Sequence, residues 1–386
     1  MAKKKRVLYF MPDNPFWSHA GNLTRAKQLL TYFEQHSEEL EVEFLSCLFW
    51  DFESIEKFKA TYPHVHLTIT NTDSDKRNRI KYLVADKIPR LINRVMHLTQ
   101  ISLLTPIISK RIKSLVGDKQ YDIILISYST WGSLISELNS SNAYKIIDTH
   151  DFMTLQRIRE KSGLYIGSAF KEEMDILSLY DEIWTYSVEE RYIYEQFTNK
   201  KVTLLPVSSN NSGILTLESK FIDILYVASD NIHNTESMKW FVESVLPLIP
   251  KYKVHVIGRI SEKIPDHPQL IKYGIVEDLG IFYAGAKITI CPMLSGTGIK
   301  IKVLESLSHG LPIVTNRRGV DGLINKINNG CLVADNEVQF AHEIKLLLEN
   351  DSFYSKQREY AQSFYHSFYT REHEESILNG MFLDNQ

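Results

Sequence analysis

Short apolar runs alternate with longer helical patterns along the whole chain, and this alternation limits the folds that the sequence can adopt. In the first half, strands are expected at residues 7–11, 42–48, 65–70, 123–127, 145–148, 182–186 and 202–205. Helices are expected between them, for example at 22–34 and 188–197. Several of the strands are continuously apolar, which is typical of parallel strands covered on both faces. The pattern predicts an α/β fold built from βα units.

The alternation pauses once, at the polar, linker-like residues 208–213, and then restarts. The second series predicts strands at 222–228, 252–257, 288–291, 312–315 and 331–333, and helices at 235–248, 278–284 and 299–309. Residues 352–380 form a further helical, aromatic-rich stretch. We therefore expect two doubly wound, Rossmann-like domains, at 1–206 and 207–365. The C-terminal helix, at 366–386, is expected to pack back on the first domain.

The composition argues against several other classes of protein. A formal net charge of -3 gives no general signature of nucleic-acid binding. The three cysteines, Cys47, Cys291 and Cys331, are scattered, so neither a disulfide framework nor a zinc site is indicated. No apolar run reaches the roughly 18 residues of a membrane span. The expectation is a cytoplasmic protein without nucleic-acid partners.

The most informative motif lies at residues 292–305, directly after an expected strand. Gly296 and Gly298 flank Thr297 and allow a ligand to approach the backbone closely. A helix is expected to begin near Ile299, and its N-terminal N–H groups carry partial positive charge. This arrangement suits an anion such as a diphosphate.

Three charged residues follow the glycines. Lys302 and Glu305 are three residues apart and share a helix face. Lys300 would lie about 200° around a helix from Lys302, so both lysines reach one ligand only if Lys300 precedes the helix or sits in its first turn. A cation near the helix start suits phosphate, and a carboxylate further along suits ribose hydroxyls. The alternative is a glycine-containing turn before an amphipathic helix with solvated lysines.

Residues 274–322 resemble the donor half of the retaining family-4 (group 1) glycosyltransferases of the GT-B fold. The resemblance rests on the Gly-Ile-Val-Glu-Asp-Leu segment at 274–279, Tyr-Ala-Gly-Ala at 283–286, and Gly-Thr-Gly-Ile-Lys-Ile-Lys-Val-Leu-Glu at 296–305. Gly-Leu-Pro-Ile-Val at 310–314 and Gly-Val-Asp-Gly at 319–322 complete it. The resemblance implies two Rossmann-like domains facing across a cleft. It also implies that Glu305 holds the donor ribose and that the main chain at Ile275 and Val276 holds the base.

Two departures from the family pattern affect the diphosphate. The usual first glutamate, eight positions before the second, is replaced by Thr297. The usual Gly-Arg and Lys-Gly cations are missing from residues 228–234, where Ser229 stands after the strand. We infer that Lys300 and Lys302 supply the cations, as in a Gly-x-Gly-x-Lys-x-Lys variant of the family. Arg259 is a weaker candidate, with a surface arginine as the alternative.

A second polar segment follows the strand at 145–148. It reads Asp-Thr-His-Asp at 148–151 and resembles a segment whose histidine contacts the donor sugar near the reacting carbon. We carry that role to His150 and a supporting one to Asp151. A lone histidine would otherwise be a surface or core residue. Arg157 suits either an anionic ligand or a helix-surface ion pair.

The first βα loop is expected to face the acceptor. Related enzymes carry a glycine-containing segment and an arginine here, matched by Gly21 and Arg25. Trp17 suits stacking on a sugar ring or, alternatively, a buried loop anchor.

The stretch from Lys76 to Lys113 holds ten basic residues and one acidic residue, a formal charge of +9, interleaved with apolar residues. Such a segment suits an anionic membrane surface. The alternative is a pair of ordinary helices with basic outer faces.

Together these features predict transfer of a sugar from a nucleoside diphosphate sugar to a hydroxyl of a glycan or lipid-linked acceptor. The resemblance implies retention of configuration and a role in bacterial surface polysaccharide or glycoconjugate synthesis at the inner face of the membrane. No metal motif, cofactor or general base is apparent, and none is expected. The alternatives are a nucleotide-sugar 2-epimerase of the same fold and a non-catalytic binding subunit.

Overall fold

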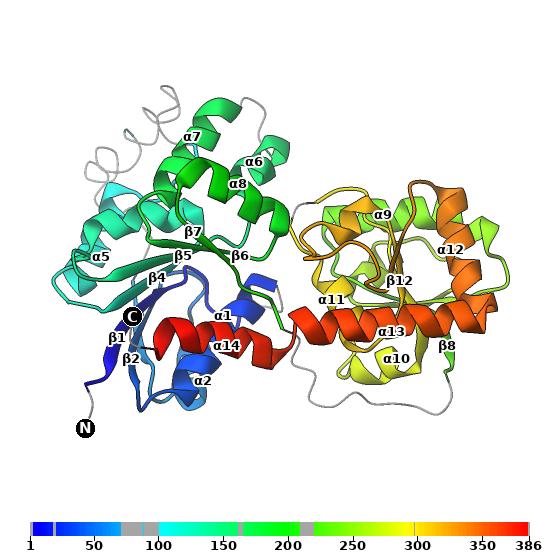
Figure 1. Ribbon diagram of the computed structural model, residues 1–386, viewed down its shortest axis with the longest axis horizontal. Coiled ribbons are helices and arrows are strands. Elements are labelled where there is room, and N and C mark those ends of the chain that lie inside the picture. Colours follow the sequence, from blue (N-terminus) through cyan, green and yellow to red (C-terminus); the bar gives the residue numbers. More distant parts are fainter. Residues whose placement is uncertain are drawn as a thin grey trace. The chain divides into compact units, whose positions relative to one another are not determined.

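The computed structural model describes residues 3–17, 21–70, 88, 100–160, 165–208, 220–296 and 298–384. The chain divides into two compact units (Figure 1). The N-terminal unit comprises Met1–Tyr186, Glu190–Leu205 and Ile377–Gln386, and the C-terminal unit comprises Ser187–Glu189 and Pro206–Ser376. Each unit is built around one parallel sheet.

The sheet of the N-terminal unit has seven strands in the order β3-β2-β1-β4-β5-β6-β7, and every neighbouring pair is parallel. The strands match the predicted runs closely: β1 (Lys5–Phe10), β2 (Leu40–Ser46), β3 (His66–Ile69), β4 (Ile123–Ser127), β5 (Tyr144–Asp148), β6 (Glu182–Thr185) and β7 (Lys201–Leu204). The order reverses between β1 and β4, where the chain crosses to the other half of the sheet.

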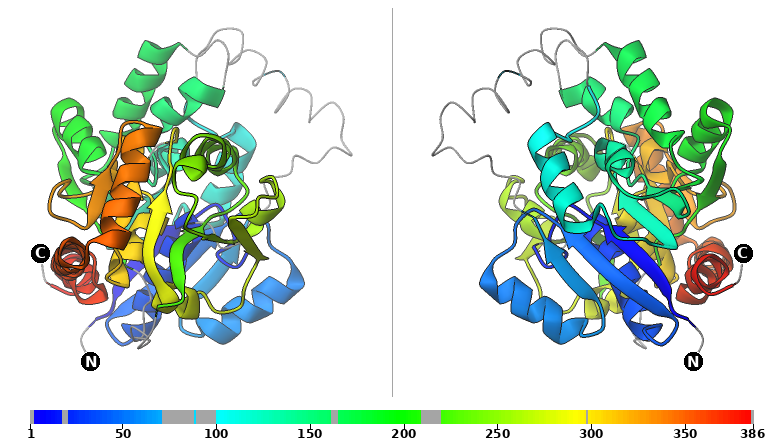
Figure 2. Two further views of the ribbon diagram at one scale, coloured as in Figure 1. Left: turned by 90° about the vertical axis from the view of Figure 1, so that its right-hand side faces the viewer. Right: turned by 90° about the vertical axis from the view of Figure 1, so that its left-hand side faces the viewer.

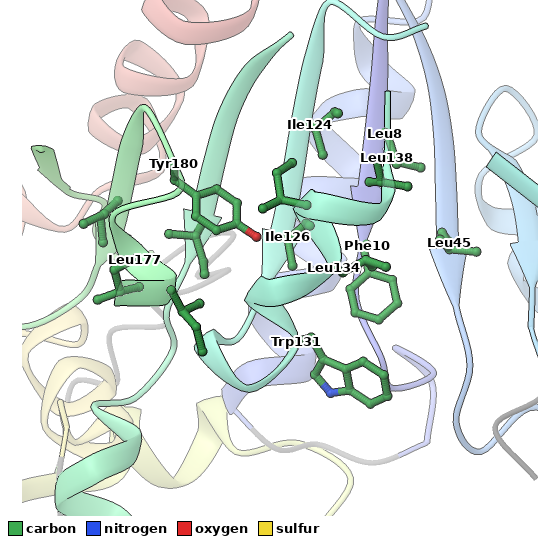
Figure 3. Packing of buried hydrophobic residues seen from close by; sticks show 14 of the residues in the cluster. Leu8, Phe10, Leu45, Ile124, Ile126, Trp131, Leu134, Leu138, Leu177 and Tyr180 are labelled. Carbon is green, nitrogen blue, oxygen red and sulfur yellow. The ribbon is translucent and has the colours of Figure 1, made fainter. Parts of the chain in front are cut away.

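Helices cover both faces of this sheet, so successive strand residues enter different cores. Leu8 and Phe10 join one apolar cluster, whereas Val7 and Tyr9 join the other. In Figure 3 the ring of Phe10 lies beside the indole of Trp131, with centroids 5.4 Å apart. The covering elements are α1 (Gly21–Gln35), α2 (Phe52–Thr61), α5 (Pro106–Val116), η2 (Ser129–Glu137), α6 (Met153–Glu160), α7 (Ile166–Leu177) and α8 (Val188–Thr198).

The sheet of the C-terminal unit has six parallel strands in the order β10-β9-β8-β11-β12-β13. This is the strand order of a dinucleotide-binding Rossmann fold. The strands are β8 (Ile222–Val227), β9 (Val254–Ile257), β10 (Leu270–Gly274), β11 (Ala286–Cys291), β12 (Ile313–Thr315) and β13 (Cys331–Val333). Strand β10 was not predicted, because an edge strand lacks the continuous apolar run of a central one.

The helices of the C-terminal unit are α9 (Ile232–Trp240), α10 (Gly280–Gly285), α11 (Ile301–Ser308), α12 (Glu337–Glu349) and α13 (Asp351–Phe368). The single helix predicted at 235–248 is α9 followed by a π turn, Phe241–Val245, and a 3-10 turn, Leu246–Leu248. Pro247, which has no N–H to donate, lies in that last turn and accounts for its tighter geometry. The short 3-10 elements Arg259–Glu262 and Arg317–Val320 follow β9 and β12.

The last helix, α14 (Arg371–Phe382), begins in the C-terminal unit, and from Ile377 onward its residues belong to the N-terminal unit. Its Leu378, Met381 and Phe382 belong to the same buried cluster as Phe33 and Trp184. In Figure 2 the red helix lies beside the blue first elements of the chain. Within the described residues, no helix has the length and apolar character required to cross a bilayer.

Candidate functional site

The site in the C-terminal unit lies where the strand order reverses, between β8 and β11. Ligands of open α/β sheets bind outside the carboxyl ends of the strands at such a point. Ser229 follows β8, and the loop that contains Gly296 and Gly298 follows β11. The predicted donor residues therefore lie at the position where this fold binds ligands.

The loop after β11 depends on glycine at two positions. Gly296 has φ +102° and Gly298 has φ +69°, a backbone region that side chains with a Cβ rarely adopt. A Cβ at Gly296 would also lie 3.3 Å from Met293 Cε. Thr297, the other predicted residue of this loop, lies outside the described residues.

Lys300 precedes the helix instead of lying on it. Helix α11 begins at Ile301, two residues later than predicted, and Lys300 is its N-cap residue with φ -95° and ψ 101°. The Lys300 side chain is buried, and its Nζ donates to Gly298 O at 2.6 Å. The structure thereby meets the condition under which Lys300 and Lys302 can serve one ligand.

Lys302 lies in the first turn of α11 and reaches back across the sheet. Its Nζ donates to Asn234 Oδ1 at 2.5 Å and lies 5.2 Å from the ring centroid of Tyr226 on β8. Burial lowers the pKa of Lys302, whereas nearby Glu305 acts in the opposite direction. An anionic ligand would favour the charged form of this lysine in the same way.

Asn234 connects the lysine to the loop after β8. Its Nδ2 donates to Ser229 O at 3.0 Å, and its own N–H donates to Asn231 Oδ1, which caps α9. Next to it, His233 Nδ1 lies 2.7 Å from Ser295 Oγ, in the loop after β11. Sequence reasoning did not identify His233 or Asn234. Both residues lie within 228–234, the segment that stands where the family has its Gly-Arg pattern. This position was the sequence signal that could have identified them.

Glu305 lies one turn beyond Lys302 on α11. Tyr283 Oη, from α10, donates to Glu305 Oε2 at 3.0 Å, and the Tyr283 ring stacks on His309 with centroids 4.6 Å apart. Burial raises the pKa of Glu305, while Tyr283 and Lys302 lower it. The carboxyl group is thus positioned by a neighbour and needs further hydrogen-bond donors to stay charged.

Ile275 and Val276 follow β10, at the same end of the sheet. The Ile275 side chain is 77% exposed, whereas Val276 packs on the cluster around Tyr283. Gly274, just before them, has φ +70° and turns the chain out of the strand. Because the Ile275 side chain is exposed, a base can contact either this side chain or the main chain of the same residue.

The N-terminal unit holds a buried polar cluster at the carboxyl end of β5. His150 has φ +58°, which is rare for a residue with a Cβ, and its ring stacks on Tyr128 with centroids 4.3 Å apart. Tyr186 Oη lies 3.1 Å from both Asp148 Oδ2 and His150 Nδ1. Burial lowers the pKa of His150. His150 is therefore a neutral, fixed ring and not a mobile surface histidine.

Arg25 of α1 joins this cluster. Its side chain is fully buried, and Nε lies 3.6 Å from Asp148 Oδ2. Its guanidinium carbon lies 5.7 Å from the centroid of the Tyr186 ring. Arg25, predicted for the acceptor side, thus contacts the residues around His150, and Gly21 begins the same helix.

Two buried glutamates support the segment that follows His150. Glu173 accepts hydrogen bonds from the N–H groups of Met153 and Thr154, at the first turn of α6. Glu190 Oε2 accepts from Thr185 Oγ1 at 2.7 Å, and burial raises the pKa of Glu190 to about 8, with Asp151 contributing in the same direction. Asp151 itself is half-buried, and Arg157 is buried on α6. No sequence pattern singled out either glutamate.

Trp17 is exposed, which contradicts the buried-anchor alternative. The side chain is 59% exposed and stacks on Phe49, itself 50% exposed, with ring centroids 4.7 Å apart. Phe49 has φ +61°, and Asn14 Nδ2 donates to its carbonyl at 2.9 Å. The two rings form an aromatic pair on the loops that follow β1 and β2.

Most of the basic segment, namely residues 76–87 and 89–99, lies outside the described residues. Of its charged residues, Lys110, Arg111 and Lys113 lie on α5, whose Ile108 and Ile112 are buried. Lys110 and Lys113 are exposed. Among the described residues, no group of three or more His, Cys, Asp or Glu side chains is arranged to hold a metal ion.

Comparison with known proteins matches residues 222–350 to the family model described as "Glycosyl transferases group 1". A curated protein from Klebsiella pneumoniae, described as an uncharacterized 44.6 kDa protein in the cps region, is 26% identical over 128 residues. That match covers 29% of this chain and spans only a third (33%) of the length of the relative.

Solved structures match over nearly the whole chain. Sucrose-phosphate synthase from Thermosynechococcus elongatus has a TM-score of 0.67 at 11% identity, covering 98% of each chain. The Anabaena protein HepE (Alr3699), solved in complex with UDP and glucose, has a TM-score of 0.63 at 10% identity, covering 98% of this chain and 99% of its own. At such identities the likeness concerns the fold, and it confirms the predicted GT-B architecture of two doubly wound units.

Proposed function

We propose that this chain, which belongs to the group 1 glycosyl transferases through its C-terminal unit, moves a sugar from a nucleoside diphosphate sugar to a hydroxyl acceptor. One observation carries the proposal. The glycine loop, Lys300 and the helix α11 with Lys302 and Glu305 follow β11 in this order, at the point where the strand order reverses beside β8. HepE, which shares the fold, was solved with UDP and glucose, and this supports a nucleotide-sugar donor.

Each part of the donor has a candidate partner in the C-terminal unit. Lys300, Lys302, the loop of Gly296, Thr297 and Gly298, and the start of α11 would hold the diphosphate. Glu305 would accept hydrogen bonds from the ribose hydroxyls. The base would lie against the main chain at Ile275 and Val276, and Ser229 would lie beside the phosphates.

The chemistry we propose is electrostatic stabilisation of the leaving diphosphate, with no metal and no cofactor. Negative charge develops on the bridging oxygen as the bond to the sugar breaks, and fixed cations and helix N–H groups stabilise that charge. His150 and Asp151 of the N-terminal unit would contact the donor sugar near the reacting carbon. The anomeric configuration would be retained, and the leaving phosphate would take the acceptor proton.

The acceptor we propose is a glycan or a lipid-linked glycan of a bacterial surface polysaccharide. The relative from a cps region supports this class of product. The exposed pair of Trp17 and Phe49 provides aromatic faces suited to a sugar ring. The protein would work in the cytoplasm, at the inner face of the membrane, with the stretch from Lys76 to Lys113 in contact with anionic lipid.

A thermal-shift screen of nucleoside diphosphate sugars tests the donor assignment. A ligand present at 100 times its Kd stabilises a protein by about 2.7 kcal/mol, so the true donor should raise the Tm clearly. The best donor is then incubated with the protein alone, with added chelator, and with glycan acceptors. Transfer to an acceptor supports the proposal, and activity that survives the chelator supports a metal-free reaction.

Two other outcomes would replace the proposal. Release of a free sugar epimer without any acceptor would indicate a nucleotide-sugar 2-epimerase. Binding without either reaction would indicate a non-catalytic subunit, a possibility raised by the missing first glutamate at Thr297.

A further inference from the structure

Two lysines of the N-terminal unit share one aromatic ring. Lys27 of α1 and Lys57 of α2 place their Nζ atoms 5.7 Å and 5.1 Å from the centroid of the Phe16 ring. Both distances lie within the roughly 6 Å over which the face of an aromatic ring attracts a cation. The Phe16 ring therefore brings two positive charges, from two different helices, to one place.

The ring that joins the two lysines is held by α2. It stacks on Tyr62 with centroids 6.1 Å apart and meets Phe58 edge-on at 6.5 Å. Tyr62 and Phe58 are buried, Phe16 itself is half-buried, and Lys57 is exposed. The ring is thus a fixed support in the first βα loop, and the lysines beside it can be reached from solvent.

The two ammonium groups are not neutralised by carboxylates. Among the described residues, neither Lys27 nor Lys57 forms an ion pair, and Glu56 of α2 pairs instead with Lys59 at 3.1 Å. Partial burial lowers the pKa of Lys27, and the charge of Lys57 lowers it further. The two charges therefore repel each other, and an anion bound to both would relieve that repulsion.

The residue type of the pair favours phosphate over carboxylate. An ammonium group is a compact point charge that binds phosphate well, whereas the planar fork of arginine is the better match to a carboxylate. A terminal phosphate also offers three strong acceptor oxygens, so one phosphate can accept hydrogen bonds from both lysines.

We propose that Lys27 and Lys57 bind a phosphate group of the acceptor. Phe16 directly precedes Trp17, whose ring stacks on Phe49 in the aromatic pair proposed above for an acceptor sugar. The acceptor would then carry its phosphate close to that sugar, as a lipid-linked glycan or a sugar phosphate does. That the phosphate belongs to the acceptor rests on the proposed function, whereas the phosphate site rests on the two lysines and the ring.

Binding can be measured at the lysines themselves. Methylation with ¹³C keeps the positive charge of lysine, and the ¹H–¹³C signals are assigned with Lys27→Gln, Lys57→Gln and Lys59→Gln. We expect geranyl diphosphate, a lipid phosphate, or glucose 1-phosphate, a sugar phosphate, to shift the Lys27 and Lys57 signals and to leave the Lys59 signal in place. The probe that binds more tightly identifies the source of the phosphate. Geraniol and glucuronic acid, which lack phosphate, are the control ligands.

Lys27→Gln and Lys57→Gln should each weaken binding of the tighter phosphate probe by about fivefold. Lys59→Gln is the matched control, because it removes an exposed charge from the same helix, and it should keep wild-type affinity. The inference is wrong if neither phosphate probe shifts the two signals, if glucuronic acid binds as tightly, or if both site variants keep wild-type affinity.

The donor site is tested separately on the same variants. UDP should bind to the wild type, Lys27→Gln and Lys57→Gln with equal affinity, because the donor residues lie in the C-terminal unit. If no nucleoside diphosphate or its sugar binds any variant, the proposed function fails, while the lysine signals still decide whether the pair binds phosphate.

Discussion

Glu305 accepts a hydrogen bond from Tyr283 and lies within the electrostatic influence of Lys302, so its carboxyl group is positioned before any ligand arrives. We expect Glu305→Ala to weaken binding of a nucleoside diphosphate by about 1–3 kcal/mol, because hydrogen bonds from ribose hydroxyls to a charged group are lost. Tyr283→Phe should weaken this binding less, by about 0.5–1.5 kcal/mol, because it removes only the hydrogen bond that positions Glu305. Calorimetry with UDP measures both, and Glu262→Ala, outside the site, is the control. Unchanged affinity in folded Glu305→Ala would remove this residue from the site.

Lys302 is a half-buried cation in the first turn of α11 that contacts Asn234 of α9 and Tyr226 of β8. Loss of one group that stabilises developing charge typically slows an enzyme by about 10²–10³-fold. We expect Lys302→Ala and Lys300→Ala to lower kcat on this scale, with smaller changes in KM for the donor. Lys239→Ala, on the exposed part of α9, should retain full turnover. Wild-type kcat in both site variants would contradict the diphosphate assignment.

Glu190 makes the stability of the protein depend on pH. Burial raises the pKa of Glu190 to about 8 from its ordinary value of 4.5. Between these values the unfolded chain releases the proton and the folded protein keeps it, so stability falls as pH rises from about 4.5 to about 8. Below pH 4.5 Glu190 is protonated in both the folded and the unfolded state, so it no longer makes the free energy of unfolding depend on pH.

We therefore expect Glu190→Gln, which keeps the shape but cannot ionise, to gain stability relative to wild type as pH rises. The difference in the free energy of unfolding should be on the order of a few kcal/mol larger at pH 8 than at pH 5. Urea unfolding at the two pH values measures it, and Glu195→Gln, an exposed carboxylate on the same helix, is the control. An equal difference at both pH values would show that Glu190 does not carry the effect.

At the scale of elements, the loop between β2 and α2 holds Phe49 in an unfavourable conformation. A φ of +61° in a residue with a Cβ costs about 1–2 kcal/mol, and the ring it presents stacks on Trp17 in solvent. Such strain is retained where the surroundings impose it, often at binding sites. The loop is further fixed by Asn14, whose side chain bonds to the Phe49 carbonyl.

Phe49→Gly and Phe49→Ala form a matched pair, because both remove the ring and only glycine adopts this φ freely. We expect Phe49→Gly to be the more stable by about 1 kcal/mol, measured by urea unfolding. Both variants should lose transfer to a glycan acceptor while keeping hydrolysis of the donor. Full transfer in both variants would show that the aromatic pair does not bind the acceptor.

For the whole molecule, the segment from Lys76 to Lys113 concentrates +9 of charge in a chain whose net charge is -3. Each basic residue near an anionic membrane contributes about 1 kcal/mol, so half of them would give measurable binding. We expect co-sedimentation with anionic vesicles at low salt and its loss near 1 M salt, where the Debye length is about 3 Å. Neutral phosphatidylcholine vesicles are the control. Failure to bind anionic vesicles at low salt would favour a soluble glycan or protein acceptor.

The two-unit α/β architecture and nearly all of its strands could be predicted from the sequence, because strands that are buried on both faces consist of continuous runs of apolar residues. The glycine loop could also be predicted, because the positive φ angles at Gly296 and Gly298 strongly favour glycine. Elements whose residues face both solvent and core, such as α12 and the edge strand β10, carry weaker patterns and were missed.

What the sequence could not decide is which distant residues meet. Arg25 lies on α1, Asp148 is the last residue of β5, and Tyr186 follows β6. Only the order of the parallel strands in the sheet brings these residues together around His150. Lys302 meets Asn234 because β8 and β11 are neighbours, a pairing that no local pattern encodes. Local apolar periodicity and backbone preference determined the elements, whereas the strand order, a property of the assembled sheet, decided which polar and charged side chains meet in the site.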